Sequence, residues 1–260
     1  MRVLVTGGTG QLGREVVRAA VAAGHAVRVL SRRPRREPGA DLTWAVGDLA
    51  TGQGLQQAVG HIDAIVHAAS DPRNAPAADI EGTRHLAEAA RAARVAHVVY
   101  VSIVGIDRIP YRYYQCKLEA ERVLAESGVP YSILRATQFH SFIAFLLNLA
   151  ARVPLMLPVP AGFHVQSVGI EDVAARLLHA LGEGPGGLLP DFGGPEVMTL
   201  EDAAVEWTRS RPRGRYKSVA SIYVPGRMAA AFRAGYNTAP HGERGTLTWR
   251  DWLSRTLMSV

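Results

Sequence analysis

The sequence predicts an α/β fold, in which a doubly wound parallel sheet carries helices on both faces and a small C-terminal region follows. Three observations predict it. Apolar runs alternate with helical stretches from residue 2 onward, a glycine-rich turn joins the first run to the first helix, and the alternation ends after residue 134. Such alternation is typical of parallel strands, because each pair needs a helical crossover to connect it.

Six short apolar runs account for the strands of the predicted sheet. Between them lie helical stretches, in which apolar residues such as Leu12, Val16 and Ala20 recur at positions that share one face of a helix. The runs expected to form strands are residues 2–5, 26–30, 43–46, 64–68, 97–101 and 131–134.

The most apolar long stretch covers residues 136–151, between Arg135 and Arg152. It is too short to cross a bilayer comfortably, so we expect a buried helix and no contact with a membrane. A proline-rich stretch at 154–160 and a helix at 170–181 follow, and there is no internal repeat.

Composition is that of one globular core. Of the 260 residues, 48% are hydrophobic and 20% are charged, which argues against disorder. The single cysteine, Cys116, cannot form an intramolecular disulfide, and no Cys/His cluster has the spacing of a zinc site. We therefore expect no bound metal. The first strand begins directly after Met1, without a leader sequence, so we expect a cytoplasmic protein.

The net charge of +6 arises partly from two arginine clusters. The cluster at residues 209–217 lacks an aromatic platform or a recognition helix, so we interpret it as a solvated loop and expect no nucleic-acid partner. A nucleic-acid role would require an affinity that falls steeply with salt. The first cluster comprises Arg32, Arg33, Arg35 and Arg36, and the second comprises Arg209, Arg211, Arg213, Arg215 and Lys217.

The first strand leads into a glycine-rich turn that predicts a Rossmann-type dinucleotide site. Gly7 permits the tight turn, Gly10 lets the backbone approach a pyrophosphate, and Gly13 allows close packing of the helix. The helix N-terminus adds amide donors and a favourable dipole. The whole candidate loop is Gly7, Thr9, Gly10, Gln11, Leu12 and Gly13.

The end of the second strand indicates which dinucleotide binds. An acidic residue there would bind the ribose hydroxyls of NAD, whereas this chain has Ser31 and Arg32. An arginine can pair with the 2′-phosphate of NADP(H), and the serine hydroxyl can add a contact. We therefore expect NADP(H), with the alternative that Arg32 only faces water.

Two further turns fit the same cofactor. Asp48 and Leu49 follow the third strand, where they are expected to contact the adenine; Asp48 can equally be a turn or cap residue. Ala68, Ala69 and Ser70 follow the fourth strand, where small side chains let the backbone lie close to the ribose and phosphates.

Together with the runs Val66-His67-Ala68-Ala69 and Tyr113-Tyr114-Gln115-Cys116-Lys117, these motifs resemble the atypical short-chain dehydrogenase/reductases, particularly the NmrA-like branch. The resemblance covers about the first 180 residues, as far as the Gly169-Ile170-Glu171-Asp172-Val173-Ala174 run. It implies a doubly wound parallel sheet, a nicotinamide cofactor and a substrate pocket formed by the C-terminal region.

Tyr113 and Lys117 are the candidates for the chemistry. Four residues apart on a helix, they project from one face, so a cationic lysine can lower the pKa of a phenol that acts as a general acid. The family resemblance implies that Lys117 also holds the nicotinamide ribose and that Ser102 binds the substrate oxygen. Tyr114 is the alternative phenol, and the short connection at residues 103–112 argues against a close Ser102–Tyr113 pair.

The expected activity is NADP(H)-dependent hydride transfer to a small apolar carbonyl or quinone, bound by Phe139, His140 and Phe163; His140 has a structural role as its alternative. Residues 1–152 are expected to form the cofactor domain, and residues 153–260 a smaller substrate-binding region that partly continues the core fold. Two other functions stay open. One is a non-catalytic NADP(H)-binding redox sensor, and the other is an epimerase or dehydratase.

Overall fold

The computed structural model describes residues 1–34, 41–211 and 217–257, so Arg35, Arg36, Arg213 and Arg215 of the arginine clusters lie outside the described residues. The chain forms two compact units that interleave along the sequence. Which segments bind cofactor and substrate, and hence the boundary after residue 152, stays a prediction. Unit 1 comprises Met1–Ser102, Arg112–Arg135 and Val173–Pro190; unit 2 comprises Ile103–Tyr111, Ala136–Asp172 and Asp191–Val260.

Unit 1 is built on a mostly parallel sheet with the strand order β6-β5-β4-β1-β2-β3. β1 pairs in parallel with β2 and β4, β2 with β3, and β4 with β5. All six predicted strands are confirmed, with ends that differ by one or two residues. The strands are β1 (Arg2–Thr6), β2 (Ala26–Ser31), β3 (Leu42–Val46), β4 (Ala64–His67), β5 (His97–Ile103), β6 (Tyr131–Ala136) and a short β9 (Gly187–Leu188) that pairs with β6.

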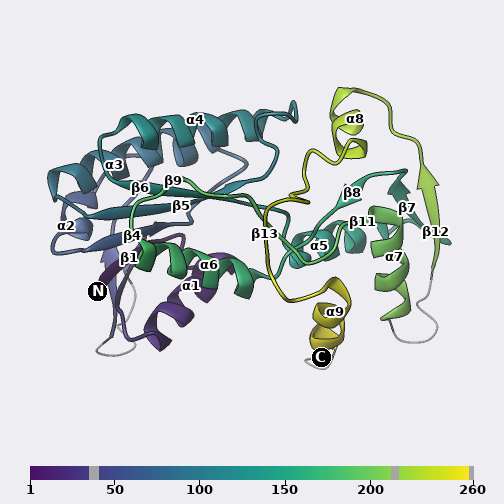
Figure 1. Ribbon diagram of the computed structural model, residues 1–260, viewed down its shortest axis with the longest axis horizontal. Helices are drawn as coiled ribbons and strands as arrows, with labels where there is room; N and C mark the ends of the chain where they lie inside the picture. The colour runs from purple at the N-terminus through teal and green to yellow at the C-terminus, as the bar shows by residue number, and fades with distance from the viewer. Residues whose placement is uncertain (35–40, 212–216, 258–260) are drawn as a thin grey trace. The chain divides into compact units, whose positions relative to one another are not determined.

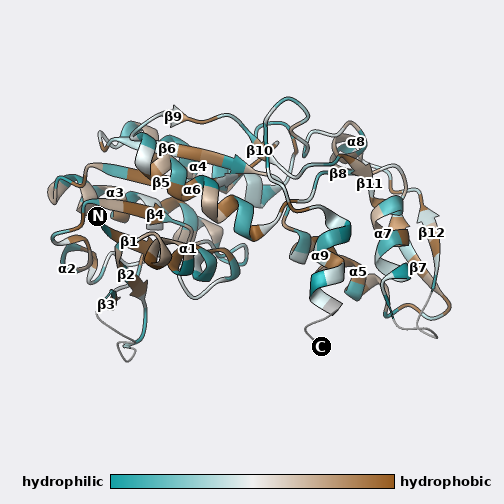
Figure 2. Ribbon diagram, turned by 60° about the horizontal axis from the view of Figure 1, so that its bottom comes forward, coloured by the Kyte–Doolittle hydropathy of each residue, from teal (hydrophilic) through white to brown (hydrophobic). Residues whose placement is uncertain are grey.

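Helices cover both faces of this sheet, as the sequence predicts (Figure 1). On one side lie α1 and α6, and on the other lie α2, α3 and α4. Leu4 and Ile65 of the sheet pack against Leu86 and Leu124 of the second group in one buried cluster, and the strands are largely brown in Figure 2. The helices are α1 (Gln11–Ala22), α2 (Leu55–Val59), the π-helical turn η1 (Pro76–Glu81), α3 (Gly82–Ala92), α4 (Arg112–Glu126) and α6 (Ile170–Glu183).

Unit 2 has its own core, in which Leu147, Leu157, Trp207 and Trp249 pack together. β12 pairs in parallel with β7, β11 pairs antiparallel with β8, and β10 pairs with β13 and with Ala136. The elements are α5 (His140–Ala150), β7 (Met156–Pro160), β8 (His164–Val165), β10 (Phe192–Gly193), β11 (Met198–Thr199), α7 (Leu200–Arg209), β12 (Ser218–Ile222), α8 (Arg227–Arg233), β13 (Glu243–Arg244) and α9 (Trp249–Leu257).

The helix expected at residues 136–151 is α5, which begins later than predicted because Ala136 completes β6. The expectation that this helix is buried is wrong for one of its faces. Ile143 and Leu147 are buried, whereas Phe145 is 60% exposed. Apolar residues occupy two faces of α5, and only one of them meets the core of unit 2. Among the described helices, none is long and apolar enough to cross a membrane.

Candidate functional site

The glycine turn between β1 and α1 has the geometry that its sequence predicts. Gly7 has a φ of +69°, and a Cβ there would lie 2.6 Å from the carbonyl oxygen of Ala68. A Cβ at Gly13 would overlap with the carbonyl oxygen of Gly7. Only glycine therefore allows β1, α1 and the end of β4 to approach one another as they do.

The N-terminus of α1 opens beside this turn. Gly10 is the N-cap residue, its amide donates to the Gly7 carbonyl at 2.8 Å, and no side chain caps the helix. The first-turn amides at Leu12 and Gly13 have no carbonyl within the helix to bond. A Cβ at Gly10 would meet only Gly7 within 4 Å, so the outer side of the turn is open. This cradle of amides and glycine backbone fits a pyrophosphate.

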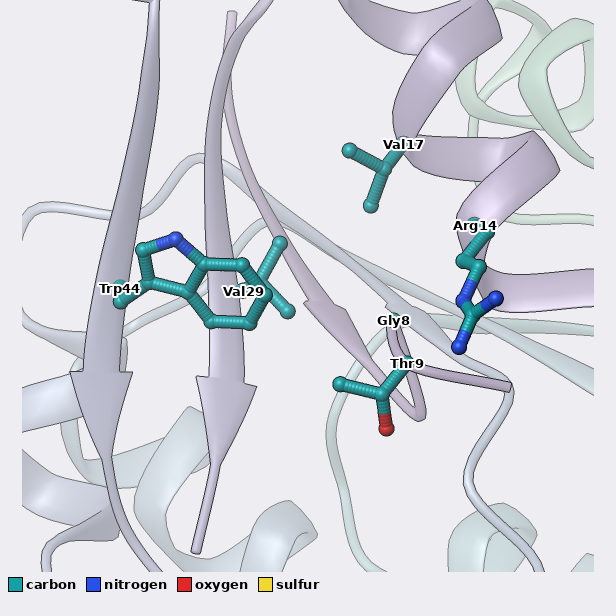
Figure 3. Close-up of a pocket in the computed structure, with 6 residues that line it drawn as sticks. All are labelled: Gly8, Thr9, Arg14, Val17, Val29 and Trp44. Carbon is teal, nitrogen blue, oxygen red and sulfur yellow. The ribbon is translucent and has the colours of Figure 1, made fainter. Parts of the chain in front are cut away.

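A cavity of about 250 Å³ lies beside the glycine turn, between α1 and strands β2 and β3 (Figure 3). The guanidinium of Arg14 points toward Gly8 and Thr9 in this view. Arg14 and Arg32 are exposed, and neither side chain has a partner among the described residues. Two unpaired cations thus lie near the end of β2. The cavity is lined by Gly8, Thr9, Arg14, Val17, Val29 and Trp44.

The other residues predicted to contact the adenosine half have structural contacts. Ser31 Oγ accepts a hydrogen bond from the amide of Arg33 at 3.3 Å. Asp48 Oδ1 accepts from the amide of Ala50 at 2.9 Å, which is the turn interaction that the sequence left open. Leu49 is partly buried against the core of unit 1. Their contacts with a cofactor stay predictions.

A buried chain of hydrogen bonds fixes the loop after β4. The amide of Ala69 donates to Thr6 Oγ1 at 3.3 Å, and Thr6 Oγ1 lies 2.7 Å from His67 Nδ1. His67 Nε2 lies 3.0 Å from Thr83 Oγ1, whose hydroxyl donates to the carbonyl of Asp79. Because each hydroxyl has one proton, His67 accepts at Nδ1 and donates from Nε2. Burial lowers the pKa of His67 to about 3, which agrees with a neutral ring.

Ser70 joins Tyr113 to a buried carboxylate. Ser70 Oγ donates to Asp79 Oδ1 at 2.7 Å and lies 2.7 Å from the hydroxyl of Tyr113. Since the single proton of Ser70 is given to Asp79, the phenol of Tyr113 is the donor to Ser70. Asp79 Oδ2 accepts from the amide of Asp71 at 3.2 Å. The Asp79 carboxylate therefore orients the phenol through Ser70.

Lys117 lies against the same carboxylate. Its Nζ is 3.7 Å from Asp79 Oδ1, donates to the carbonyl of Val101 at 2.9 Å and lies 4.1 Å from the centre of the Tyr100 ring. Burial lowers the pKa of Lys117 to about 8, and the charges of Asp79 and Glu121 oppose that shift. Tyr113 and Lys117, predicted as a pair from their spacing, thus meet through Ser70 and Asp79.

Ser102 does not join this network. Ser102 is buried, and its Oγ has no hydrogen-bond partner among the described residues. Tyr114 is buried in the core, whereas Tyr113 is half-buried. Of the two phenols that the sequence leaves open, Tyr113 is the more exposed, and it is hydrogen-bonded to Ser70.

Asp79, the centre of this network, was not among the residues predicted from the sequence. Asp79 lies on η1 and is completely buried. One signal could have found it. Asp79, Thr83, Leu86 and Ala90 follow one another at the spacing of a single helix face, and the last two are plainly core residues. A carboxylate on that inward face requires a buried partner.

The residues predicted to bind substrate all belong to unit 2. His140 Nδ1 is 2.8 Å from Ser167 Oγ and its Nε2 is 3.0 Å from the carbonyl oxygen of Leu247, so both ring nitrogens are engaged. This arrangement favours the structural role left open for His140. Phe139 precedes α5 as its N-cap residue, and Phe163 stacks on Phe232 with 5.3 Å between ring centres.

Comparisons with curated proteins give two kinds of relative. The chain is 33% identical to the photosystem II assembly factor Ycf39 of Cyanophora paradoxa over 151 residues, which cover 54% of the chain and 46% of that protein. The chain thus spans about half the length of this relative. It is 30% identical to the (4-alkanoyl-5-oxo-2,5-dihydrofuran-3-yl)methyl phosphate reductase of Streptomyces griseus over 219 residues, which cover 80% of the chain and 73% of that protein.

A solved structure shares the fold. The NADPH-dependent quinone oxidoreductase of Escherichia coli, in complex with NADPH, superposes with a TM-score of 0.77 at 20% identity and covers 98% of this chain and 99% of that one. At this identity the likeness concerns the fold alone.

A family match covers most of unit 1. Residues 7–182, from the glycine turn to α6, match the family described as NAD(P)H-binding. This segment contains the phosphate cradle as well as Ser70, Asp79, Tyr113 and Lys117. The chain belongs to the NAD(P)H-binding family, whose cofactor is a nicotinamide dinucleotide, which agrees with the resemblance to the atypical short-chain dehydrogenase/reductases seen in the sequence.

Proposed function

We propose that the chain is an NADP(H)-dependent oxidoreductase that transfers hydride between the nicotinamide and a small apolar carbonyl or quinone. One observation carries the proposal. The phenol of Tyr113 is hydrogen-bonded through Ser70 to the buried carboxylate of Asp79, beside the cation of Lys117. A phenol that only packs against its neighbours does not need such a network.

The chain's own residues manage the proton of this reaction, while the bound cofactor supplies or accepts hydride. Tyr113 gives its proton to the substrate oxygen, so that a carbonyl, one hydride and one proton yield a hydroxyl. Before the reaction Ser70 holds the phenol in position by accepting its hydrogen bond, and the phenol turns that one proton from Ser70 to the substrate oxygen when it reacts. Lys117 stabilises the negative charge left on Tyr113 until solvent, which reaches this half-buried side chain, returns a proton.

NADP(H) is the preferred dinucleotide in this proposal. Arg14 and Arg32 bring two exposed cations without partners, among the described residues, to the region where a 2′-phosphate would lie. Ser31, Arg32 and Arg33 stand at the end of β2, where an acidic residue would bind the ribose hydroxyls of NAD. Arg14 was not a predicted site residue; only its place after Gly13 in the α1 helix hinted at it.

The first experiment is an NADPH-oxidation screen against quinones and aromatic carbonyls, with cofactor binding measured by calorimetry on the same samples. Tyr113→Phe should bind NADPH as the wild type does and lose about 100-fold or more in kcat. Tyr114→Phe is the matched control, because it removes the neighbouring hydroxyl and should keep turnover. Full turnover by Tyr113→Phe would remove that phenol from the mechanism.

The second candidate is a non-catalytic NADP(H)-responsive protein, and one observation favours it. Ser102, which the family resemblance makes the substrate-binding serine, has no hydrogen bond to Tyr113 or to any other described residue. Turnover by the single variants Ser70→Ala and Ser102→Ala, compared with that of the wild type, separates the two candidate functions. In the enzyme, Ser70→Ala lowers kcat about tenfold or more and leaves NADPH binding intact. In the binding protein, no acceptor is turned over by any variant.

A further inference from the structure

Helix α5 has two apolar faces on opposite sides. His140, Ile143, Ala144 and Leu147 are buried in the core of unit 2. A second set of apolar residues repeats the same three-and-four spacing on the other side, and the helix is largely brown in Figure 2. We call this second set the α5 outer face: Phe142, Phe145, Leu146 and Leu149, all at least 38% exposed.

The apolar surface continues beyond the end of α5. Val153 and Met156 are more than 40% exposed, and Leu155 is 90% exposed. Leu155 also has a φ of +68°, a conformation that costs a residue with a side chain about 1 kcal/mol or more. Large apolar side chains that lie together in water indicate an interaction surface. One of them, Leu155, is exposed by a turn with a left-handed backbone conformation.

Positive charge is fixed at the same end of the helix. Lys217 Nζ donates to the carbonyls of Ala151 and Val153, both at 2.6 Å. The Arg211 guanidinium lies 4.0 Å from the centre of the Trp207 ring. It also donates to Asn148, two residues before the end of α5. These contacts hold two cations beside the apolar run.

The segment of the chain that carries the α5 outer face contains no acidic residue. Arg152 is exposed at the end of the helix, and residues 127–170 contain no Asp or Glu. We propose that the α5 outer face is a docking surface for an anionic lipid bilayer. The apolar side chains enter the headgroup region, and Arg152, Arg211 and Lys217 lie against the lipid phosphates.

Two other occupants fit less well. A second copy of the chain, docked symmetrically through this face, would bring the same cations of both copies together without acidic partners. Insertion across the bilayer is excluded by length, since the 11 residues of α5 span about 16 Å and the hydrocarbon core is about 30 Å thick. A helix that lies in the plane of the bilayer surface agrees both with the cations beside α5 and with the length of α5.

Vesicle co-sedimentation of the full chain tests the proposal. The protein should bind vesicles of phosphatidylcholine with about 30% phosphatidylglycerol at least about tenfold more tightly than vesicles of phosphatidylcholine alone. Raising NaCl from about 0.05 M to about 0.5 M should weaken the binding. Equal binding to both vesicle types, or none to either, would overturn the proposal.

Variants locate the surface. Phe145→Ser combined with Leu149→Ser should lose about tenfold or more in vesicle binding, and Arg152→Glu should lose severalfold. Leu188→Ser, an exposed apolar residue of β9, and Arg91→Glu, an exposed cation of α3, are the matched controls and should bind as the wild type does. All replaced side chains are exposed, so thermal midpoints should stay within about 4 °C of the wild type.

Sedimentation velocity completes the test. One outcome would assign the face to a second copy and refute the lipid proposal. In it, the wild type is a dimer that does not bind vesicles, and the Phe145→Ser/Leu149→Ser variant is a monomer. Vesicle binding that the double variant retains would equally refute it, because the contact would then lie elsewhere. A monomer whose vesicle binding depends on the α5 outer face supports it.

Discussion

Lys117 Nζ lies 3.7 Å from Asp79 Oδ1, and neither side chain is more than 3% exposed. A buried ion pair contributes little net stability, but removal of one partner leaves an uncompensated charge away from water. This relationship makes the two residues interdependent, and it ties the geometry around Tyr113 to the stability of unit 1.

Asp79→Ala should therefore lower the free energy of unfolding by about 3 kcal/mol or more, measured by urea denaturation. Glu81→Ala is the matched control on the same turn. It removes an exposed carboxylate that pairs with Arg84, and should stay within about 1 kcal/mol of the wild type. Adding Lys117→Met to Asp79→Ala should recover part of the loss; no recovery would contradict the role of charge.

The lowered pKa of Lys117 predicts an alkaline limit to turnover. The cation that stabilises charge on Tyr113 loses its proton as the pH rises through about 8. For the reduction of a carbonyl or quinone, we expect kcat/KM to fall above that pH. A neutral amine no longer stabilises the negative charge that forms on Tyr113. Lys117→Arg keeps the charge and should move this limit upward. An unchanged limit in that variant would assign the titration to another group.

His67 should make the protein acid-sensitive. Its pKa in the folded chain is about 3, below the ordinary value of 6.5, so the unfolded chain binds the proton more readily. The contribution is fully present above pH 6.5 and is lost as the pH falls toward 3. Between pH 7 and pH 4 we expect a loss of about 3 kcal/mol from this group.

Urea unfolding of the wild type, His67→Gln and His241→Gln at these two pH values measures that contribution. His67→Gln should flatten the pH dependence, whereas the exposed His241 should leave it as in the wild type. Parallel pH profiles for all three proteins would show that the acid sensitivity arises elsewhere.

Arg14 and Arg32 should set the preference for NADPH over NADH. Arg14→Ala and Arg32→Ala are each expected to weaken NADPH binding about tenfold or more and to leave NADH binding nearly unchanged. Arg18→Ala, on the same helix as Arg14, is the control, because Arg18 is already paired with Glu15. Equal weakening of both dinucleotides would exclude contact with the 2′-phosphate. Calorimetric titration gives both affinities.

The sequence was most informative where structure is local. The glycine turn could be predicted because the positive φ of Gly7 and the contact of Gly13 with the Gly7 carbonyl both lie within one strand, turn and helix. The strands were found because each is a short apolar run between turns. Tyr113 and Lys117 could be proposed as a pair because their spacing on one helix is itself the signal.

Long-range pairing explains what the sequence did not reveal. Asp79 and Lys117 meet across two helices, and no local pattern connects them. The contact of Ser70 with the cofactor stays a prediction from its place after a strand end, and no local pattern revealed its hydrogen bonds to Tyr113 and Asp79. For α5, the strongly apolar sequence predicted a buried helix. Which face is covered depends on the packing of α7, β7 and α9, which periodicity cannot supply.

The two units interleave along the sequence, which limits how the chain can be cut or recombined with a relative. Two of the three stretches that form unit 2 begin and end at segments of unit 1, so no single cut releases unit 2 as a continuous peptide. Its contacts join residues far apart in sequence, which slows folding relative to a domain made of one stretch. Recombination with a relative would therefore have to exchange three stretches together to transplant unit 2, while a simple crossover would produce mismatched cores.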